Sequence, residues 1–216
     1  MLVTITGGAR SGKSRFAEQL AVHMAKQKGS AGYYIATAEA GDEEMAVRIH
    51  DHKERRKQTM PGFVTIEEPY DVAAAIQKIS RQDEAENVRE LPNRISSSTN
   101  HRRNNRSSVI LVDCLTLWLS NWLLRPEHDQ PQVHIQEKVT ELIEAAAAST
   151  ADILFVTNEV GDGLVPEYPL GRLYRDQAGW MNQQVAARSA KVFLVTAGIP
   201  LELKEHQYRI SDDFPD

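Results

Sequence analysis

The chain has 216 residues, which is enough for one α/β domain with a sizeable core and too few for two full domains. Its net charge of −5 argues against a general binder of nucleic acids or membrane surfaces, and its single cysteine, Cys114, excludes an intrachain disulfide and a cysteine-rich metal site. No apolar run reaches the ~18 residues of a membrane span, and the first residues already read as a strand rather than a signal peptide, so we expect a cytoplasmic protein.

Apolar runs alternate with helix-like segments along the whole chain. We predict strands at Leu2–Thr6, Gly32–Ala36, Phe63–Ile66, Val109–Val112, Ile153–Thr157 and Val192–Thr196. We predict helices at Lys13–Lys28, Glu43–Gln58, Asp71–Arg81, Leu115–Leu124, Val133–Ser149 and Gly171–Ser189. The strands at 109–112 and 153–156 are continuously apolar, as parallel strands covered on both faces require. The order predicts a three-layer α/β domain over residues 1–204 with a mostly parallel sheet, and residues 198–203 are expected to return as an antiparallel edge strand.

Two segments depart from this alternation. Residues Gln82–Ser108 are polar, lack aromatic side chains and include the basic run Arg102-Arg103-Asn104-Asn105-Arg106. A nucleic-acid patch is one interpretation of that run. Without aromatic residues for base stacking and without periodicity, the composition favours a disordered surface insertion instead, and we expect no nucleic-acid partner. Residues 205–216 are expected to form a loosely ordered tail.

Residues 7–14 are the most informative stretch of the chain. They read Gly-Gly-Ala-Arg-Ser-Gly-Lys-Ser and fit the G-x-x-x-x-G-K-[ST] phosphate-binding loop, with a strand before them and a helix after them. Glycines let backbone N–H groups wrap around phosphate oxygens. We predict nucleotide binding by this loop, with Lys13 on the β/γ-phosphates and Ser14 on Mg²⁺. The loop comprises Gly7, Gly8, Ala9, Arg10, Ser11, Gly12, Lys13 and Ser14.

Asp113 follows the strand predicted at Val109–Val112. A carboxylate at that place matches a Walker B position, which holds Mg²⁺ directly or through water. The alternative is an ordinary helix N-cap before Leu115. The phosphate-binding loop favours the metal-binding interpretation.

The helix predicted at Glu43–Gln58 combines histidine with several cations. Arg48, His52, Arg55 and Arg56 fall close together on its surface. A histidine on such a helix is usually a solvated bystander, but cations suit a triphosphate and neutral imidazole can attack phosphorus. The spacing alone leaves both interpretations open.

The fifth predicted strand ends in Thr157-Asn158-Glu159-Val160-Gly161, at the edge where open α/β sheets bind ligands. Farther along, Arg172 and Arg175 lie three residues apart on a predicted helix. Both side chains could face one anion, or Arg172 could form a surface salt bridge with Asp176. The sequence does not decide between the two.

Five segments taken together resemble one family. They are the phosphate-binding loop through Glu18, the run Tyr34–Ala38, the run Glu44–Ile49 with His52, the run Thr157–Gly161, and the stretch from Val165 to Gln183. They are similar to the bifunctional adenosylcobinamide kinase / adenosylcobinamide-phosphate guanylyltransferase family of cobalamin biosynthesis, from residue 1 to about residue 204 apart from the 82–108 insertion. The resemblance implies a RecA-like P-loop fold and a compact homo-oligomer, often a trimer.

The resemblance also implies two activities. Adenosylcobinamide is phosphorylated by ATP or GTP, and GTP then transfers GMP to that phosphate through a guanylyl-histidine, with Mg²⁺ as cofactor. The nucleophile implied is His52, in the Arg-Ile-x-x-His-Lys pattern, with His50 as a competitor. Further nucleotide contacts implied by the family are Thr37, Ala38, Glu39, Lys53, Glu54, Arg55, Arg56, the guanosine-binding Glu67 and, at the Walker B position where some relatives carry Glu, Asp113.

Two other functions remain open at this point. One is a P-loop kinase of a small metabolite, in which the histidines are bystanders. The other is a nucleotide-gated binding module that docks through the basic insertion. The first predicts phosphorylation without a covalent nucleotide, and the second predicts only slow hydrolysis.

Overall fold

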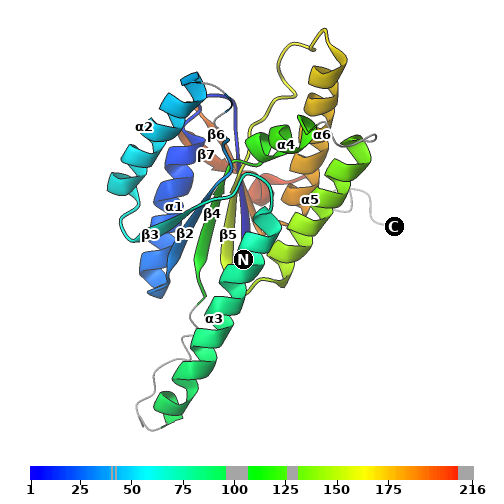
Figure 1. The fold of residues 1–216 in the computed structure, drawn as a ribbon. Helices are drawn as coiled ribbons and strands as arrows, with labels where there is room; N and C mark the ends of the chain where they lie inside the picture. Colours follow the sequence, from blue (N-terminus) through cyan, green and yellow to red (C-terminus); the bar gives the residue numbers. More distant parts are fainter. Residues whose placement is uncertain (40, 42, 96–106, 126–130, 209–216) are drawn as a thin grey trace.

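A seven-stranded sheet forms the centre of the computed structural model, which describes residues 1–39, 41, 43–95, 107–125 and 131–208 (Figure 1). The strand order is β3-β2-β4-β5-β1-β6-β7, and every neighbouring pair is parallel except β6 and β7. The mostly parallel sheet and its antiparallel edge strand are therefore confirmed. The strands are β1 (Leu2–Thr6), β2 (Gly32–Ala36), β3 (Phe63–Glu67), β4 (Val109–Asp113), β5 (Asp152–Val156), β6 (Lys191–Thr196) and β7 (Ile199–Glu202).

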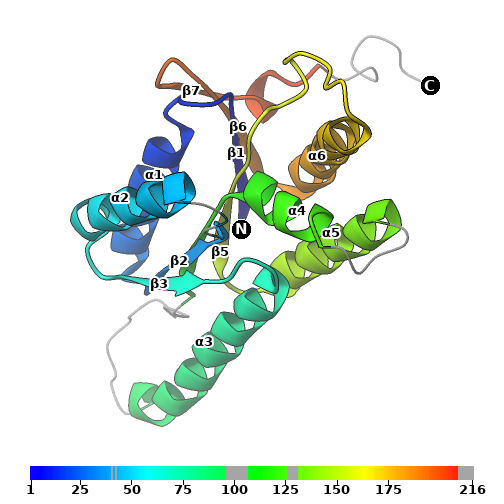
Figure 2. The same cartoon turned by 45° about the horizontal axis from the view of Figure 1, so that its top comes forward.

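Helices cover both faces of the sheet, as the three-layer prediction requires. On one face lie α1 (Lys13–Lys28) and α2 (Glu43–Thr59) (Figure 2). On the other lie α3 (Val72–Ile95), α4 (Leu115–Leu123), α5 (Pro131–Ala148) and α6 (Pro169–Arg188). A short 3₁₀ helix, Lys204–His206, follows β7. In the part of the chain that the structure describes, no helix is long and apolar enough to cross a membrane.

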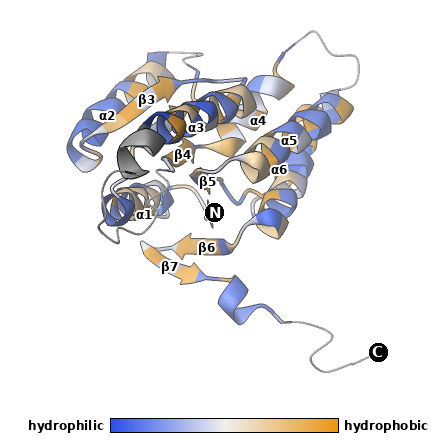
Figure 3. Ribbon diagram, turned by 90° about the horizontal axis from the view of Figure 1, so that it is seen from below, coloured by the Kyte–Doolittle hydropathy of each residue, from blue (hydrophilic) through white to orange (hydrophobic). Residues whose placement is uncertain are grey.

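Each face of the sheet has its own apolar core. Ile110, Val112, Ile153 and Phe155 pack against α3 to α6, whereas neighbouring residues such as Leu111 on the same strands pack against α1. Both sides of β4 and β5 are therefore buried, which explains why their sequences are continuously apolar. Figure 3 shows these central strands in hydrophobic colours and much of the surrounding helix surface in hydrophilic ones.

One helix is longer than the sequence led us to expect. The helix predicted to end at Arg81 continues as α3 to Ile95 and projects beyond the sheet (Figure 1). The prediction of a disordered insertion from Gln82 is therefore wrong for residues 82–95. Eight of these fourteen residues are Glu, Arg, Gln, Ala or Leu, which favour a helix. The basic run at 102–106 lies outside the described residues.

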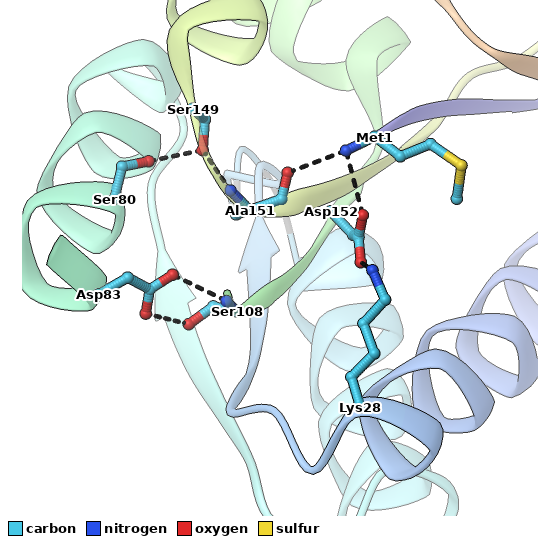
Figure 4. Close-up of polar contacts among 8 residues, drawn as sticks. All are labelled: Met1, Lys28, Ser80, Asp83, Ser108, Ser149, Ala151 and Asp152. Carbon is cyan, nitrogen blue, oxygen red and sulfur yellow. Dashed lines mark hydrogen bonds and ion pairs between the residues drawn. The ribbon is translucent and has the colours of Figure 1, made fainter. Parts of the chain in front are cut away.

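The amino ends of the strands are joined by polar contacts (Figure 4). Asp152 is only 3% exposed and accepts hydrogen bonds from the Met1 ammonium group, at 3.1 Å, and from Lys28. The backbone N–H and the hydroxyl of Ser108 both donate to the Asp83 carboxylate, at 2.7 and 2.6 Å. These contacts fix the start of β4 to α3 and the start of β5 to α1.

The carboxyl ends of the parallel strands lie at the other end of the sheet, away from these contacts. The phosphate-binding loop follows β1, Glu67 ends β3, Asp113 ends β4 and Asn158 follows β5. Because β5 lies between β1 and β4, these residues come together at one end of the sheet. Open α/β sheets bind ligands at this end.

Candidate nucleotide-binding site

The loop between β1 and α1 has a backbone that requires glycine at two positions. Gly12 has a φ of +95°, and a Cβ there would lie 3.2 Å from the Cα of Gly198. A Cβ at Gly7 would lie 2.4 Å from the carbonyl oxygen of Val195. The N-terminus of α1 has no acidic residue in its first turn and no side-chain cap, so its N–H groups and its positive helix dipole are available to an anion.

Lys13 begins α1 beneath this loop. Its side chain is buried, with 8% of the residue exposed, and its Nζ donates a hydrogen bond to the carbonyl oxygen of Gly8 at 3.1 Å. Burial lowers the pKa of Lys13, while nearby Cys114 and Asp113 oppose that shift. None of the ion pairs among the described residues includes Lys13, so a phosphate group would supply the charge partner that it lacks.

A cavity of about 760 Å³ opens next to the loop and is bounded by α1, α2, β2, β4 and the end of β5. Most of the residues predicted to bind nucleotide line it. They are Ala9, Arg10, Ser11, Gly12, Lys13, Ser14, Ala38, His52, Lys53, Arg55, Arg56, Glu67 and Asp113. Elements far apart in the sequence therefore place their cations and polar groups around one space.

The cations of α2 form one wall of the cavity. Arg56 is 7% exposed, and its guanidinium lies over the Tyr34 ring, 4.1 Å from the ring centroid. Arg55 donates to Glu18 at 2.6 Å, and Lys53 pairs with Glu67 at 2.5 Å. The buried Nε of Arg56 has no hydrogen-bond partner among the described residues. A buried, unpaired donor in a cavity wall favours an anionic or polar ligand.

His52 lies in the same wall of the cavity as these arginines. Its pKa is lowered from the ordinary value of 6.5, first by burial and then by the positive charge of Arg55. The imidazole therefore stays neutral, and able to act as a nucleophile, at lower pH than an isolated histidine. His50 is exposed and does not line the cavity.

Asp113 faces the cavity from the last position of β4. Its Oδ2 accepts a hydrogen bond from the Tyr34 hydroxyl at 3.1 Å, and the pKa of Tyr34 is raised well above 10 by burial and by this carboxylate. The residue at the N-cap of α4 is Cys114 rather than Asp113, so the alternative of a helix cap does not describe this carboxylate. Asp113 remains available to the cavity.

Ser14 and Asp113 supply oxygen donors of the kind that Mg²⁺ prefers. Among the described residues, no three His, Cys, Asp or Glu side chains are grouped closely enough to hold a metal by themselves. A hydroxyl and one carboxylate fit a Mg²⁺ ion that takes its other ligands from water and nucleotide phosphates, as in P-loop enzymes.

A family model described as cobinamide kinase / cobinamide phosphate guanyltransferase matches residues 3–88 and 81–203. The chain belongs to this family. The resemblance stated from the sequence is therefore confirmed, and so is the expected class of enzyme, a kinase and nucleotidyltransferase.

Three relatives cover nearly the whole chain. It is 41% identical over 200 residues to the bifunctional adenosylcobalamin biosynthesis protein CobP of Pseudomonas aeruginosa, covering 93% of this chain and 95% of that one. It is 33% identical to the CobU protein of the same description from Escherichia coli and 35% identical to that from Salmonella typhimurium, each over 213 residues, 94% of this chain and all of the relative.

Two solved structures are similar to this chain at much lower identity. One is an ATPase domain, which gives a TM-score of 0.49 at 13% identity and covers 89% of this chain and 68% of that one. The other is the KaiC-like protein PH0186 from Pyrococcus horikoshii, which gives a TM-score of 0.41 at 15% identity, over 89% and 69% of the two chains.

Some predicted nucleotide contacts lie outside the cavity in this structure. Thr37 is fully buried, and its hydroxyl donates to the Cys114 carbonyl at 2.7 Å and accepts from the Cys114 N–H at 2.8 Å. Glu39 accepts a hydrogen bond from the Tyr70 hydroxyl, and Glu54 pairs with Lys57 on the exposed side of α2. Gly7 and Gly8 shape the phosphate-binding loop without lining the cavity.

Several cavity residues were not among the predicted site residues, and two of them, Tyr34 and Asn158, make polar contacts there. Tyr34 contacts both Arg56 and Asp113, and its neighbour Tyr33 faces the other side of the sheet. Asn158 donates from Nδ2 to the Thr116 hydroxyl at 2.6 Å. The sequence did contain a signal for each of these residues. Side chains alternate between the two faces along β2, which places Tyr34 and Tyr33 on opposite faces, and Asn158 directly follows a buried strand.

A second, smaller pocket of about 230 Å³ adjoins the cavity between α2 and β3. It shares Tyr34, Lys53, Arg56 and Glu67 with the cavity and adds apolar surface from Met60 and Phe63. Aromatic and apolar walls with one carboxylate suit a planar heterocycle that carries N–H donors.

Proposed function

We propose that the protein phosphorylates adenosylcobinamide with ATP or GTP, and then transfers GMP from GTP to the resulting phosphate through a guanylyl intermediate on His52. The observation that carries this proposal is that His52 and Lys13 line one cavity, whereas His50 does not. A phosphate-binding loop alone serves many reactions. A neutral histidine in the same cavity is a nucleophile that can attack a phosphate group, so it makes nucleotidyl transfer possible as well.

The cavity and the adjoining pocket suggest how GTP would lie. Its β- and γ-phosphates would contact the phosphate-binding loop and Lys13, and its base would occupy the pocket between α2 and β3. The Glu67 carboxylate could then accept hydrogen bonds from the N–H groups of guanine. This orientation brings the α-phosphate to the wall that contains His52.

In the transfer step, a ring nitrogen of His52 attacks the α-phosphorus. An N–P bond forms, the bond from the α-phosphorus to the bridging oxygen breaks, and pyrophosphate leaves with that oxygen. A phosphate oxygen of adenosylcobinamide phosphate then attacks the same phosphorus and releases the imidazole. Lys13, Arg55 and Arg56 stabilise the charge on the departing pyrophosphate.

In the kinase step, the hydroxyl oxygen of adenosylcobinamide attacks the γ-phosphorus directly. The bond from the γ-phosphorus to the β,γ-bridging oxygen breaks, the nucleoside diphosphate leaves with that oxygen, and the hydroxyl proton passes to water. Lys13 and the N–H groups of the phosphate-binding loop hold the triphosphate in line and stabilise the charge on its oxygens. Ser14 and Asp113 would hold Mg²⁺, which neutralises phosphate charge when it is bound. One loop can therefore serve both reactions.

The test is to incubate the protein with Mg²⁺ and GTP labelled at the α-phosphate. We expect an acid-labile, alkali-stable labelled adduct, which is lost in His52→Ala and retained in His50→Ala. The second variant is a matched control, because it removes a histidine from the same helix outside the cavity. Phosphorylation of adenosylcobinamide without any adduct would identify a plain kinase and contradict the transferase half.

We further infer that the enzyme is a cytoplasmic homo-oligomer, often a trimer in this family. The exposed edge strand β7 supports this, because Ile199 is 71% exposed and Leu201 is 49% exposed on an otherwise unpaired edge. Light scattering coupled to gel filtration should give a multiple of the chain mass of 24.2 kDa. A monomeric mass at micromolar concentration would contradict the inference.

A further inference from the structure

The connection from β5 to α6 exposes an unusual number of large apolar side chains. Leu164 is 97% exposed, Val165 is 63% exposed and Tyr168 is 64% exposed, and Leu170 in the first turn of α6 is 42% exposed. Figure 1 shows this connection, in yellow, at the upper end of the sheet. Single exposed apolar residues are ordinary, but four within seven residues mark a binding surface.

Arginine side chains of α6 hold the backbone of this connection in place. Arg172 donates from Nη1 to the carbonyl oxygens of Pro166, at 3.1 Å, and Glu167, at 2.5 Å, and Arg175 donates to the carbonyl oxygen of Gly161. A Cβ at Gly171 would lie 2.7 Å from Pro166, so the connection packs closely against α6. The two arginines therefore hold this connection, rather than face a common anion or pair with Asp176 as considered above.

The connection is also tied to the nucleotide site. The N–H of Glu159 donates to the Gly7 carbonyl of the phosphate-binding loop at 3.1 Å. Asn158 lines the cavity, and its carbonyl accepts a hydrogen bond from Asn182 of α6 at 3.0 Å. A ligand that rests on the apolar surface would therefore be held in a set position relative to the triphosphate.

The two sides of the phosphate-binding loop differ in charge. The α2 side contains Lys53, Arg55, Arg56 and Lys57, which attract phosphate. Residues 158–171 contain no lysine or arginine and three acidic residues. The guanidinium groups of Arg172 and Arg175 also lie at this connection, where they donate to its carbonyl oxygens. The connection therefore attracts phosphate less than the α2 side does, and suits an apolar ligand that is uncharged or cationic.

We propose that Leu164, Val165, Tyr168 and Leu170 form the docking surface for the corrin ring of the acceptor. This proposal rests on the proposed function, which makes adenosylcobinamide the acceptor. The ring has broad faces bearing methyl groups and carries its cobalt as a cationic centre, so it matches an apolar surface edged with carboxylates. In this arrangement the ring rests on the apolar surface, and the aminopropanol arm reaches toward the cavity that Asn158 lines.

The test compares two reactions of one variant, Leu164→Ser combined with Val165→Thr and Tyr168→Ser. All three side chains are exposed, so the fold is expected to tolerate these changes. The KM for adenosylcobinamide in the kinase reaction should rise at least about tenfold, because apolar contact area is lost. Formation of the His52 adduct from GTP alone should be unchanged, because that half-reaction needs no acceptor. Val88→Ser, at a residue that is 64% exposed on α3, is the matched control and should change neither.

An unchanged KM in the triple variant would overturn the proposal. A change in oligomeric mass, measured by light scattering, would also count against it, because the surface would then contact a second copy of the chain. Failure of the proposed function is distinguishable from both outcomes. In that case the unmodified protein would form no adduct or would fail to phosphorylate adenosylcobinamide.

Discussion

The two ends of the parallel sheet use charged residues in opposite ways. At the amino end, the buried Asp152 has two cationic partners, and Asp83 accepts two hydrogen bonds from Ser108 (Figure 4). At the carboxyl end, the buried Lys13 and Arg56 have no carboxylate within ion-pair distance among the described residues. Burying a charge without a partner is costly, so such groups are retained where a ligand supplies the partner. The amino end holds the fold together, and the carboxyl end is prepared to bind anions.

The largest expected effect tests the carboxyl end. Lys13→Met should lower kcat/KM for both reactions at least about a thousandfold, because it removes the cation on the β- and γ-phosphates. The melting temperature without nucleotide should stay the same or rise, since the variant no longer buries an unpaired charge. A large loss of thermal stability would show that Lys13 supports the fold, and would contradict the contrast between the two ends.

The next effect tests the amino end. Asp152→Ala should lower the free energy of unfolding by about 2 kcal/mol, because it removes the shared acceptor of Lys28 and the Met1 ammonium group. Denaturant unfolding measures the change. The activity per folded molecule should be unchanged, and a lower specific activity would mean that the two ends are coupled. Asp152→Asn, which keeps the size of the side chain, separates the loss of charge from the loss of packing.

A smaller effect concerns the pH dependence of the transfer step. The rate of adduct formation should fall as pH decreases, with its midpoint below 6.5, because the pKa of His52 is lowered by burial and by Arg55. In Arg55→Gln, the cation that disfavours the imidazolium is gone, so the pKa of His52 rises and the midpoint moves to higher pH. Single-turnover rates between pH 5 and pH 8 measure both midpoints. An unchanged midpoint in the variant would show that Arg55 does not lower the pKa of His52.

The smallest effect is again at the amino end. Ser80→Ala removes one hydrogen bond between side chains of α3 and the segment after α5, where the hydroxyls of Ser80 and Ser149 are 2.6 Å apart. We expect a loss of about 0.5–1 kcal/mol in the free energy of unfolding, since Ser149 keeps its bond from the Ala151 N–H. Both catalytic reactions should be unaffected. Reduced activity would show that this end also contributes to function.

Secondary structure was predictable where periodicity and buried strands gave a strong local signal. The helix Lys13–Lys28 and the strands Leu2–Thr6 and Gly32–Ala36 have the predicted bounds, and most other elements differ by one or two residues. The exception is α3, where a polar sequence was interpreted as disordered although it is helical through Ile95. A polar composition shows only that a segment is not buried. It does not exclude a helix made of residues with high helical propensity.

The candidate site was only partly predictable for a related reason. The phosphate-binding loop is a local motif, so its residues were identified from their spacing. Thr37 and Glu39 follow β2 as the family pattern led us to expect, yet Thr37 bonds to Cys114 and Glu39 to Tyr70. Tyr34 contacts Arg56 and Asp113, residues of two other elements. A local pattern contains no information about such partners.

By itself the sequence determined the class of fold, the phosphate-binding loop and the family, because each depends on residue types at fixed spacings along the chain. Only the tertiary structure decided that His52 and not His50 lines the cavity, that Arg172 and Arg175 hold the connection before α6, and that an apolar surface lies opposite the cations of α2. These features depend on the strand order of the sheet, which places β5 between β1 and β4. That order arises from packing between distant segments, and no single segment of the sequence specifies it.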